Sequence, residues 1–314
     1  MGGSGGAFGD KSSDDIKKII NDTIKITRDL SYETEIAALI DTLLSTYNGR
    51  DVESIRTHLN EIKNFIESEF GGTIDLKFGG SVSKHTYVDG LSDVDVLVLI
   101  NKLDLSSLSP KEVLERFKKE LSSRRFRDIK DITAGKLAVT VTFADETEIQ
   151  FLPAIKRGEG FKIPTESGDS WSNIIRPDKF ASRLTEINQS CGGRVVPVVK
   201  LVKGINSQLP DSQQLKGYHI ESLAIEIFKS YPQSRPKKTK EMLKYFFERG
   251  KDVIKTPIKD KTGQSINVDE YLGQETSKDR LRISNTLDII FRRMKNADDI
   301  GEVSRWKRIL GIQS

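Results

Sequence analysis

The stretch that decides the fold is residues 79–100, GGSVSKHTYVDGLSDVDVLVLI. Its two leading glycines let backbone N–H groups approach a phosphate closely, and Ser81 adds a hydroxyl donor. Asp93 and Asp95 stand two residues apart at the head of an apolar strand, so their carboxylates point to the same face. Two carboxylates on one face can bind a Mg²⁺ ion that bridges a triphosphate. The stretch therefore predicts a phosphate and metal site.

Neither half of this pattern is specific alone, because most Asp-x-Asp pairs are solvated turn residues and paired glycines are common. The two halves together, ahead of a strand that reads as buried, favour the functional interpretation. Two carboxylates so near each other also raise one another's pKa. Keeping both of them ionised therefore costs free energy unless a counter-ion is bound.

Outward from this stretch, the hydrophobic pattern changes its period along the chain. Residues 1–13 are expected to be a flexible tail or linker, because they begin with a Gly/Ser-rich run. Helical spacing is expected from Ser13 onward and over 32–46, 51–69 and 109–121, and strands over 73–78, 94–100, 137–143 and 148–152. Beyond about residue 178, helices are expected over 195–207, 218–230, 238–250, 269–271 and 276–296. The expected class is α+β, with a helical second lobe and a cleft between the lobes.

Composition excludes several classes of protein. The chain has 314 residues, of which 36% are hydrophobic, so it can bury real cores and is not a disordered chain. Cys191 is the single cysteine, which excludes a disulfide scaffold and indicates a reducing cytoplasm. The chain contains no run of about 18 apolar residues, so no membrane span is predicted. A net charge of +4 does not call for a nucleic-acid partner.

The same residues carry a resemblance to a known family. The stretch 79–100 resembles the Gly-Ser and Asp-x-Asp element of polymerase-β-like nucleotidyltransferases. The segments EIQFLPAI, GFKIPTESGDSWSNIIRPDKF, VVKLVKGIN and LKGYHIESLAIEIF are similar to the oligoadenylate-synthetase and cyclic GMP-AMP-synthase branch. They look most like its bacterial antiphage members, the cGAS/DncV-like nucleotidyltransferases, which make cyclic di- or trinucleotide signals. The resemblance runs from about residue 34 to the end, and it implies a nucleotidyltransferase core over 14–177 and a helical substrate-binding lobe over 178–314.

The resemblance also implies a role for each site residue. The nucleotide would be held by Gly80 and Ser81 at the triphosphate, Lys203 at the donor phosphates and Tyr218 at a base. Asp93 and Asp95 would bind Mg²⁺ or Mn²⁺. An acceptor ribose hydroxyl would then attack the α-phosphate of ATP or another NTP and release pyrophosphate.

One position departs from the family pattern. Where the family has a third carboxylate, an Asp three residues before Pro153, this chain has Gln150. A neutral amide is a poorer Mg²⁺ ligand than a carboxylate and cannot accept a proton. Glu148 shares the strand face, but it stands about 6.6–6.8 Å along the strand, too far to replace a ligand at about 2.1 Å. We therefore expect impaired catalysis, either from a deliberate Asp-to-Gln change or in a natural weak or dead homologue.

Three functions stay open at this point. The first is a cyclic oligonucleotide synthase. The second is a nucleotide-binding pseudoenzyme that keeps Ser81, Asp93 and Asp95, and the third is a template-independent nucleotidyltransferase acting on RNA 3′ ends. Restoring the carboxylate at Gln150 separates the first two, and elongation of labelled RNA identifies the third.

The expected partners are nucleoside triphosphates, with a regulatory protein or effector system as a further partner to look for. Basic clusters at 124–130, 237–240 and 292–293 could bind RNA, but such clusters are more often solvated faces. Nucleic-acid activation is therefore not expected, and the zinc-binding insertion of the animal DNA sensor is absent.

Overall fold

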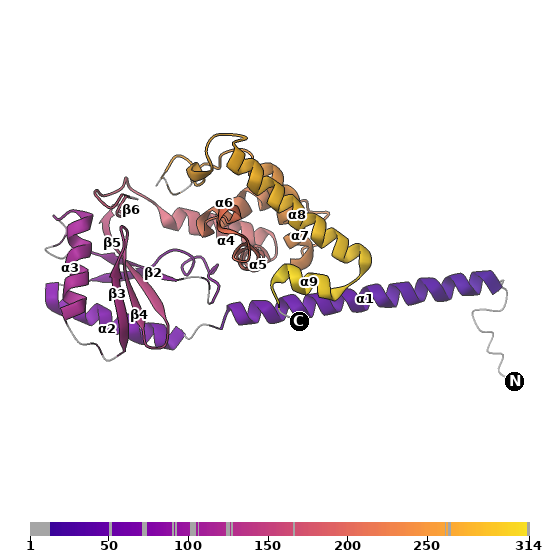
Figure 1. Ribbon diagram of the computed structural model, residues 1–314, viewed down its shortest axis with the longest axis horizontal. Helices are drawn as coiled ribbons and strands as arrows, with labels where there is room; N and C mark the ends of the chain where they lie inside the picture. The colour runs from indigo at the N-terminus through magenta and orange to yellow at the C-terminus, as the bar shows by residue number, and fades with distance from the viewer. Residues whose placement is uncertain are drawn as a thin grey trace.

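The chain folds into a sheet lobe and a helical lobe that lie side by side (Figure 1). This computed structural model describes residues 13–49, 52–70, 74–89, 91, 93–100, 105, 107–123, 126, 128–165, 167–260, 262 and 265–312. The expected α+β class is confirmed. The expected tail up to residue 12 and the basic residues at 124, 125 and 127 lie outside the described residues.

The sheet lobe contains one mixed sheet. Its strand order is β1 (Asp75–Phe78), β2 (Val94–Leu99), β5 (Glu148–Arg157), β4 (Val139–Phe143) and β3 (Ile129–Ala134), and β6 (Gly160–Lys162) pairs with β5. Strands β2 and β5 run parallel, and the other neighbours are antiparallel. Helices α2 (Val52–Phe70) and α3 (Pro110–Ser123) share a buried apolar cluster with the strands.

This packing leaves Asp95 off the apolar face. Alternation along β2 sends Val94, Val96 and Val98 into the cluster with α2 and α3. Asp95 lies between two of these valines in the sequence, so its carboxylate is directed to the other face of the sheet. The local pattern of the strand therefore decides which side of the sheet can carry chemistry.

The helical lobe packs around a second apolar cluster. Its elements are α4 (Pro177–Ser190), α5 (Val195–Asn206), α6 (Gly217–Phe228), α7 (Thr239–Val253), α8 (Lys278–Ile300) and α9 (Val303–Leu310), with short 3₁₀ turns at Asp211–Gln213 and Glu270–Leu272. None of the helices within the described residues has an apolar stretch long enough to cross a membrane.

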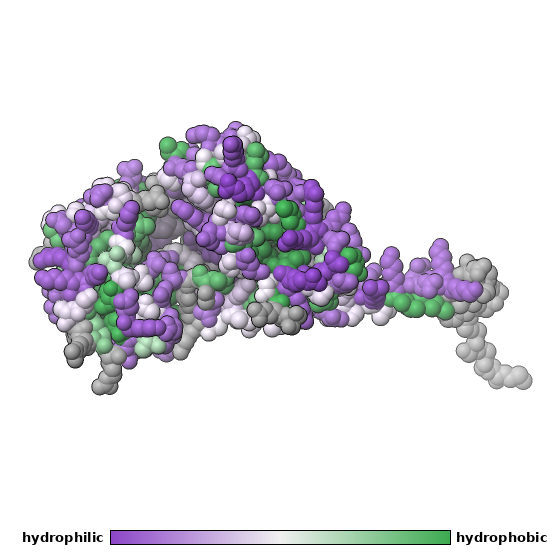
Figure 2. Space-filling view, in the orientation of Figure 1, coloured by the Kyte–Doolittle hydropathy of each residue, from purple (hydrophilic) through white to green (hydrophobic). Residues whose placement is uncertain are grey.

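Helix α1 (Ser13–Tyr47) packs with the helical lobe. The sequence prediction places residues 14–177 in the nucleotidyltransferase core, yet the buried α1 residues Tyr32, Ile36 and Ile40 belong to the apolar cluster of the helical lobe. The N-terminal half of α1 projects beyond that lobe, and apolar side chains such as Ile24 are exposed on it (Figures 1 and 2). Periodicity identifies a helix but not the lobe that covers it, because that choice depends on long-range packing.

Other elements differ from the sequence prediction in ways that burial explains. Strand β3 was not predicted because its side chains are exposed or half-buried, so it has no apolar alternation. Strand β5 continues to Arg157, five residues past its predicted end. Helix α4 was also missed, although Phe180, Leu184 and Ile187 are buried at helical spacing and Pro177 occupies its first turn.

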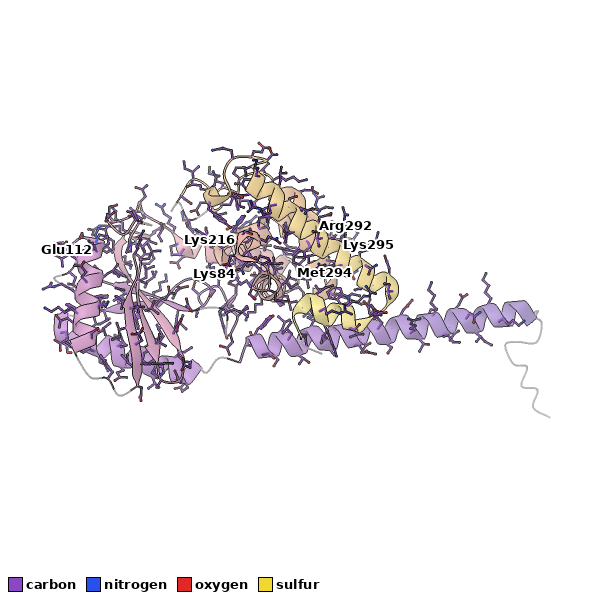
Figure 3. The ribbon with its side chains drawn as sticks, in the orientation of Figure 1. Lys84, Glu112, Lys216, Arg292, Met294 and Lys295 are labelled. Carbon is purple, nitrogen blue, oxygen red and sulfur yellow. The ribbon has the colours of Figure 1, made fainter. Side chains whose placement is uncertain are left out.

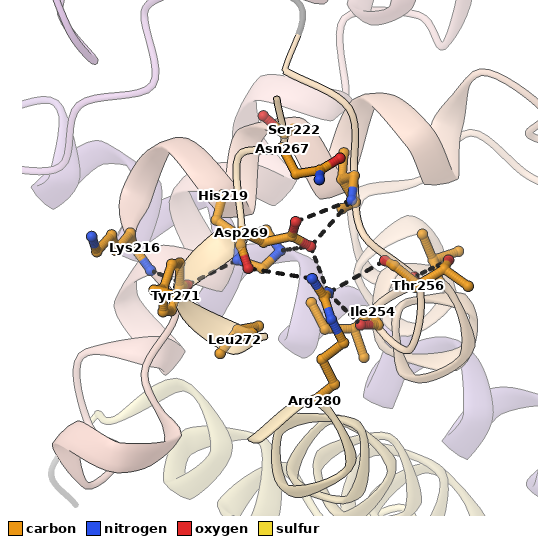
Figure 4. Close-up of polar contacts among 12 residues, drawn as sticks. Lys216, His219, Ser222, Ile254, Thr256, Asn267, Asp269, Tyr271, Leu272 and Arg280 are labelled. Carbon is orange, nitrogen blue, oxygen red and sulfur yellow. Dashed lines mark hydrogen bonds and ion pairs between the residues drawn. The ribbon is translucent and has the colours of Figure 1, made fainter. Parts of the chain in front are cut away.

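A buried polar network anchors the start of α6 (Figure 4). Arg280 and Asp269 are fully buried and form an ion pair of 2.7 Å, and Asp269 also accepts a hydrogen bond from the backbone N–H of Ile258. His219 Nδ1 shares a hydrogen bond of 2.8 Å with the Tyr271 hydroxyl. Burial lowers the pKa of His219 to about 4, so the imidazole is neutral at pH 7. The network holds the first turn of α6, the helix that faces the sheet lobe.

Candidate active site

The loop after β1 approaches β2 so closely that only glycine fits at its second position. The backbone N–H of Gly79 donates to the backbone oxygen of Asp95 at 2.8 Å. Gly80 has a φ of +49°, and a Cβ built there would stand 1.6 Å from Asp95 Oδ2. Gly80 therefore makes room for the Asp95 carboxylate, whereas the sequence prediction explained this glycine by approach to a phosphate.

We expect Gly80→Ala to abolish tight binding of Mg²⁺–ATP while the protein stays folded. The new methyl group forces the Asp95 carboxylate to move, and a positive φ costs an L-residue about 1–2 kcal/mol. Gly158→Ala is the matched control, because Gly158 has a φ of +55° and nothing lies within 4 Å of its built Cβ. Calorimetric titration with a non-hydrolysable ATP analogue and Mg²⁺ measures the effect. Unchanged affinity in Gly80→Ala would contradict this account of the loop.

Gln150 lies directly beside the two aspartates. The parallel register of β2 and β5 places Asp95 opposite Gln150, and Gln150 Nε2 donates a hydrogen bond of 2.6 Å to Asp93 Oδ2. Burial raises the pKa of Asp95, and the neighbouring Asp93 charge raises it further. The amide therefore serves as a neutral donor where a carboxylate would add a third negative charge.

Glu148 is engaged elsewhere. Its carboxylate accepts a hydrogen bond of 3.3 Å from the Thr142 hydroxyl on the neighbouring strand β4. This contact keeps Glu148 at the exposed start of β5, consistent with the expectation that it does not replace the missing carboxylate.

Asp93 and Asp95 suit a divalent cation that takes its other ligands from substrate and water, rather than a metal site made of protein ligands alone. Within the described ranges, no cluster of three His, Cys, Asp or Glu side chains could hold a metal ion. Asp93 and Asp95 supply two carboxylates, and the raised pKa of Asp95 marks a negative charge that a cation would stabilise. Mg²⁺ is commonly bound by one or two carboxylates together with substrate phosphates and water. The donor set therefore fits a Mg²⁺ ion that arrives with a triphosphate.

A cavity of about 360 Å³ collects most of the residues named from the sequence. Its lining includes Gly80, Ser81, Asp93, Asp95, Lys203 and Tyr218, while Gln150 reaches it through the contact with Asp93. A larger pocket of about 490 Å³ lies between α1 and the turn before α9, and none of these residues lines it. The candidate site residues therefore line the smaller cavity, where the sheet lobe meets α5 and α6.

Two further charged residues, neither of which has a role in the sequence prediction, line this cavity. Lys84 follows Ser81 by three residues, and Glu221 follows Tyr218 by three on α6. Glu221 is buried and forms ion pairs with Lys84 and with Lys203, the latter at 2.8 Å. Burial alone would raise the pKa of Glu221, but the two ammonium groups outweigh it and hold that pKa below its usual value. Both residues stood in segments that carried the family resemblance, which is the signal that could have found them.

Tyr218 packs against Phe180 of α4. The ring centroids lie 4.8 Å apart with an interplanar angle of 51°, and the Tyr218 hydroxyl donates to Asp260 at 2.8 Å. Burial, followed by the Asp260 charge, raises the pKa of Tyr218, which keeps the phenol protonated at neutral pH. Tyr218 therefore presents a neutral and rigidly held ring at the edge of the cavity.

The comparisons with known proteins concern the domain and the fold. Residues 35–188 match the Second Messenger Oligonucleotide or Dinucleotide Synthetase domain. No curated protein sequence matches the chain.

Three solved structures illustrate the likeness. CdnC from E. coli MS115-1 with ATP has a TM-score of 0.64 at 15% identity, covering 83% of this chain and 93% of that one. CdnC in its complex with HORMA-deltaN has a TM-score of 0.60 at 17% identity, covering 82% and 90%. The Vibrio cholerae DncV cyclic AMP-GMP synthase, in complex with the linear intermediate 5′ pppA(3′,5′)pG, has a TM-score of 0.59 at 13% identity, covering 96% and 90%. At these identities the likeness shows a shared fold, and the expected polymerase-β-like architecture is confirmed.

Proposed function

Because residues 35–188 match the Second Messenger Oligonucleotide or Dinucleotide Synthetase domain, we propose that the chain is a bacterial cGAS/DncV-like nucleotidyltransferase that synthesises a cyclic oligonucleotide from NTPs. The observation that carries the proposal is the single cavity that joins Ser81, two aspartates, two lysines and an aromatic ring. This is the set of groups that binding a triphosphate, a divalent cation and a base requires.

In this proposal each group has one task. Ser81 donates a hydrogen bond to the triphosphate, the ammonium of Lys203 neutralises it, and Tyr218 stacks on a base. Asp93 and Asp95 would hold Mg²⁺ or Mn²⁺, and a bound cation would stabilise the charge that develops on the phosphate oxygens.

The reaction balances as a phosphoryl substitution. A ribose hydroxyl oxygen forms a bond to the α-phosphorus of the donor, the bond from that phosphorus to the bridging oxygen breaks, and pyrophosphate leaves. The proton of the attacking hydroxyl must pass to a base. Gln150 cannot accept that proton, so the step depends on the carboxylates of Asp93 and Asp95, which also line the cavity. We propose that this dependence slows catalysis.

A nucleotide-binding pseudoenzyme is the second candidate, and one observation favours it. The hydrogen bond from Gln150 to Asp93 satisfies one oxygen of that carboxylate without a metal ion. A site stabilised in this way can bind a nucleotide and yet fail to transfer it. The two candidates make the same prediction for ATP binding and opposite predictions for turnover.

The function is tested by incubating the full chain with all four NTPs and Mg²⁺ or Mn²⁺. We expect phosphatase-resistant oligonucleotides in mass spectra, formed slowly, and no such product from Asp95→Asn. Extension of labelled RNA without small products would instead identify a tailing enzyme. ATP binding with no product from the wild-type chain or from Gln150→Asp would overturn the synthase proposal and leave the pseudoenzyme.

Regulation forms part of the proposal. One structural relative, CdnC, is recorded in a complex with HORMA-deltaN, which supports a search for a regulatory protein partner of this chain. We propose a role in antiphage signalling in the cytoplasm, with a downstream effector that reads the cyclic product and without activation by nucleic acid.

A further inference from the structure

Three polar groups from two lobes converge on one buried carboxylate, that of Glu221. Glu221 is 1% exposed, and its Oε1 accepts hydrogen bonds from the Thr86 hydroxyl and from Lys203 Nζ, the latter at 2.8 Å. Its Oε2 forms an ion pair with Lys84. Lys203 Nζ also donates to the backbone oxygen of Thr86 at 2.9 Å. Every one of these groups is buried or nearly so.

The convergence joins the two lobes across the cavity. Lys84 and Thr86 stand on the loop between β1 and β2 of the sheet lobe, and Lys84 lies against the helical lobe (Figure 3). Lys203 is on α5 and Glu221 on α6. A buried carboxylate that pairs with cations from both lobes restrains the gap between them, because separating the lobes would remove Lys84 and Thr86 from it and leave Lys203 as its only partner among these three.

Lys84 is also held by aromatic faces. Its Nζ stands 5.0 Å from the ring centroid of Phe180 and 5.3 Å from that of Tyr218. Cation–π contacts at this range are attractive and directional. The Lys84 ammonium is therefore fixed by three neighbours at a point between the phosphate-binding loop and the ring of Tyr218.

We propose that Glu221 is a positioning residue that holds the ammonium groups of Lys84 and Lys203 together, so that a triphosphate meets a preformed pair of cations at a fixed separation of the lobes. The inference rests on the proposed nucleotide function. It assigns the specificity for a triphosphate to the pair of Lys84 and Lys203 rather than to Lys203 alone. Two ammonium groups around one carboxylate leave a net positive charge beside Ser81, where an anion would bind. Preorganised groups of this kind gain affinity because they need no ordering when the ligand arrives.

A simpler view of Glu221 makes the opposite prediction. If it were only a counter-ion, its negative charge would repel the triphosphate, and removing that charge would tighten binding. If it positions the lysines, removing the charge lets them separate, and binding weakens. The sign of the change in affinity therefore decides between the two.

The test compares Glu221→Gln with Glu226→Gln, a control on the same helix whose carboxylate pairs with Lys229 and does not line the cavity. Calorimetry in Mg²⁺ measures the Kd of a non-hydrolysable ATP analogue and of adenosine for the full chain. We expect Glu221→Gln to bind the ATP analogue about 10- to 100-fold more weakly, the range expected when hydrogen bonds to charged groups are lost. Adenosine binding, and both affinities in Glu226→Gln, should stay within about twofold of wild type.

Lys84→Met keeps the inference testable if Glu221→Gln folds poorly on its own, because it should weaken binding of the ATP analogue without changing adenosine binding. Where both variants fold, they form a double-mutant cycle. Lys84→Met leaves the Glu221–Lys203 pair intact, and Glu221→Gln should add little further loss of triphosphate affinity once Lys84 is absent. Two results would overturn the positioning role and leave the proposed function standing. One is equal or tighter binding of the ATP analogue by Glu221→Gln, and the other is that the losses of affinity in the two single variants add up in the double variant. A wild-type chain that does not bind the analogue would overturn the proposed function as well.

Discussion

Gln150→Asp is expected to raise the rate of oligonucleotide formation by at least about 100-fold, the lower end of what a well-placed general base contributes. The parallel register places this residue opposite Asp95, and its side chain already contacts Asp93, so a carboxylate there would join both aspartates. The third carboxylate can accept the proton of the acceptor hydroxyl and supply a further oxygen ligand for a divalent cation. Initial rates from mass spectrometry or from pyrophosphate release measure the change.

A second readout does not depend on turnover. Three carboxylates in one place repel each other, so Gln150→Asp should lower the Tm in metal-free buffer and gain more from added Mg²⁺ than the wild-type chain does. Glu148→Gln is the control on the same strand face, because Glu148 bonds to Thr142 and should leave both rate and Mg²⁺ response unchanged. If Gln150→Asp shows neither a faster rate nor a larger response to Mg²⁺, the site is not a synthase that lacks only one carboxylate.

Arg280→Met is expected to destabilise the helical lobe by about 3–5 kcal/mol, the usual cost of leaving one partner of a buried ion pair without the other. Arg280 also donates to the backbone oxygens of Ile254 and Gly273, so the substitution leaves several buried acceptors unpaired. Chemical denaturation followed by circular dichroism gives the free energy of unfolding. We expect nucleotide affinity to fall in parallel, because the network holds the start of α6 beneath Tyr218 and Glu221.

Arg282→Met provides the comparison on the same helix. Arg282 pairs with Asp279 at the surface, and such pairs contribute little to stability. Its Tm should therefore stay near that of the wild-type chain. Equal destabilisation by the two substitutions would show that helix α8 itself, and not the buried pair, carries the stability.

The parts of the site that could be predicted share one property: they are local in sequence. The alternation of β2 places Val94 and Val96 in the core and Asp95 on the opposite face. The six residues of the strand are enough to predict this arrangement. The turn at Gly80 and Ser81 is equally local. The family resemblance likewise implies that Gln150, three residues before Pro153, occupies the position of a carboxylate.

The parts that could not be predicted depend on pairings across the chain. Strand β3 lacks an apolar pattern because it is poorly buried, and α1 joined the helical lobe through contacts that no periodicity encodes. Lys203 was named from its motif, yet its ion pair with Glu221 could not be inferred, and Lys84 had no assigned role. Thr86 and Glu221 are 135 residues apart, so their contact exists only once the two lobes pack.

The sequence by itself determined which chemical groups this protein offers: a Gly-Gly-Ser turn, two carboxylates on one strand face and an amide where the family resemblance predicts a third carboxylate. Only the tertiary structure decided how those groups are paired. It set the Gln150 amide on Asp93 through the register of two parallel strands, and it gave the two cavity lysines one shared carboxylate. The physical reason is that residue type and alternation are properties of neighbours along the chain, whereas strand register and ion pairing arise when distant segments compete to bury the same surface.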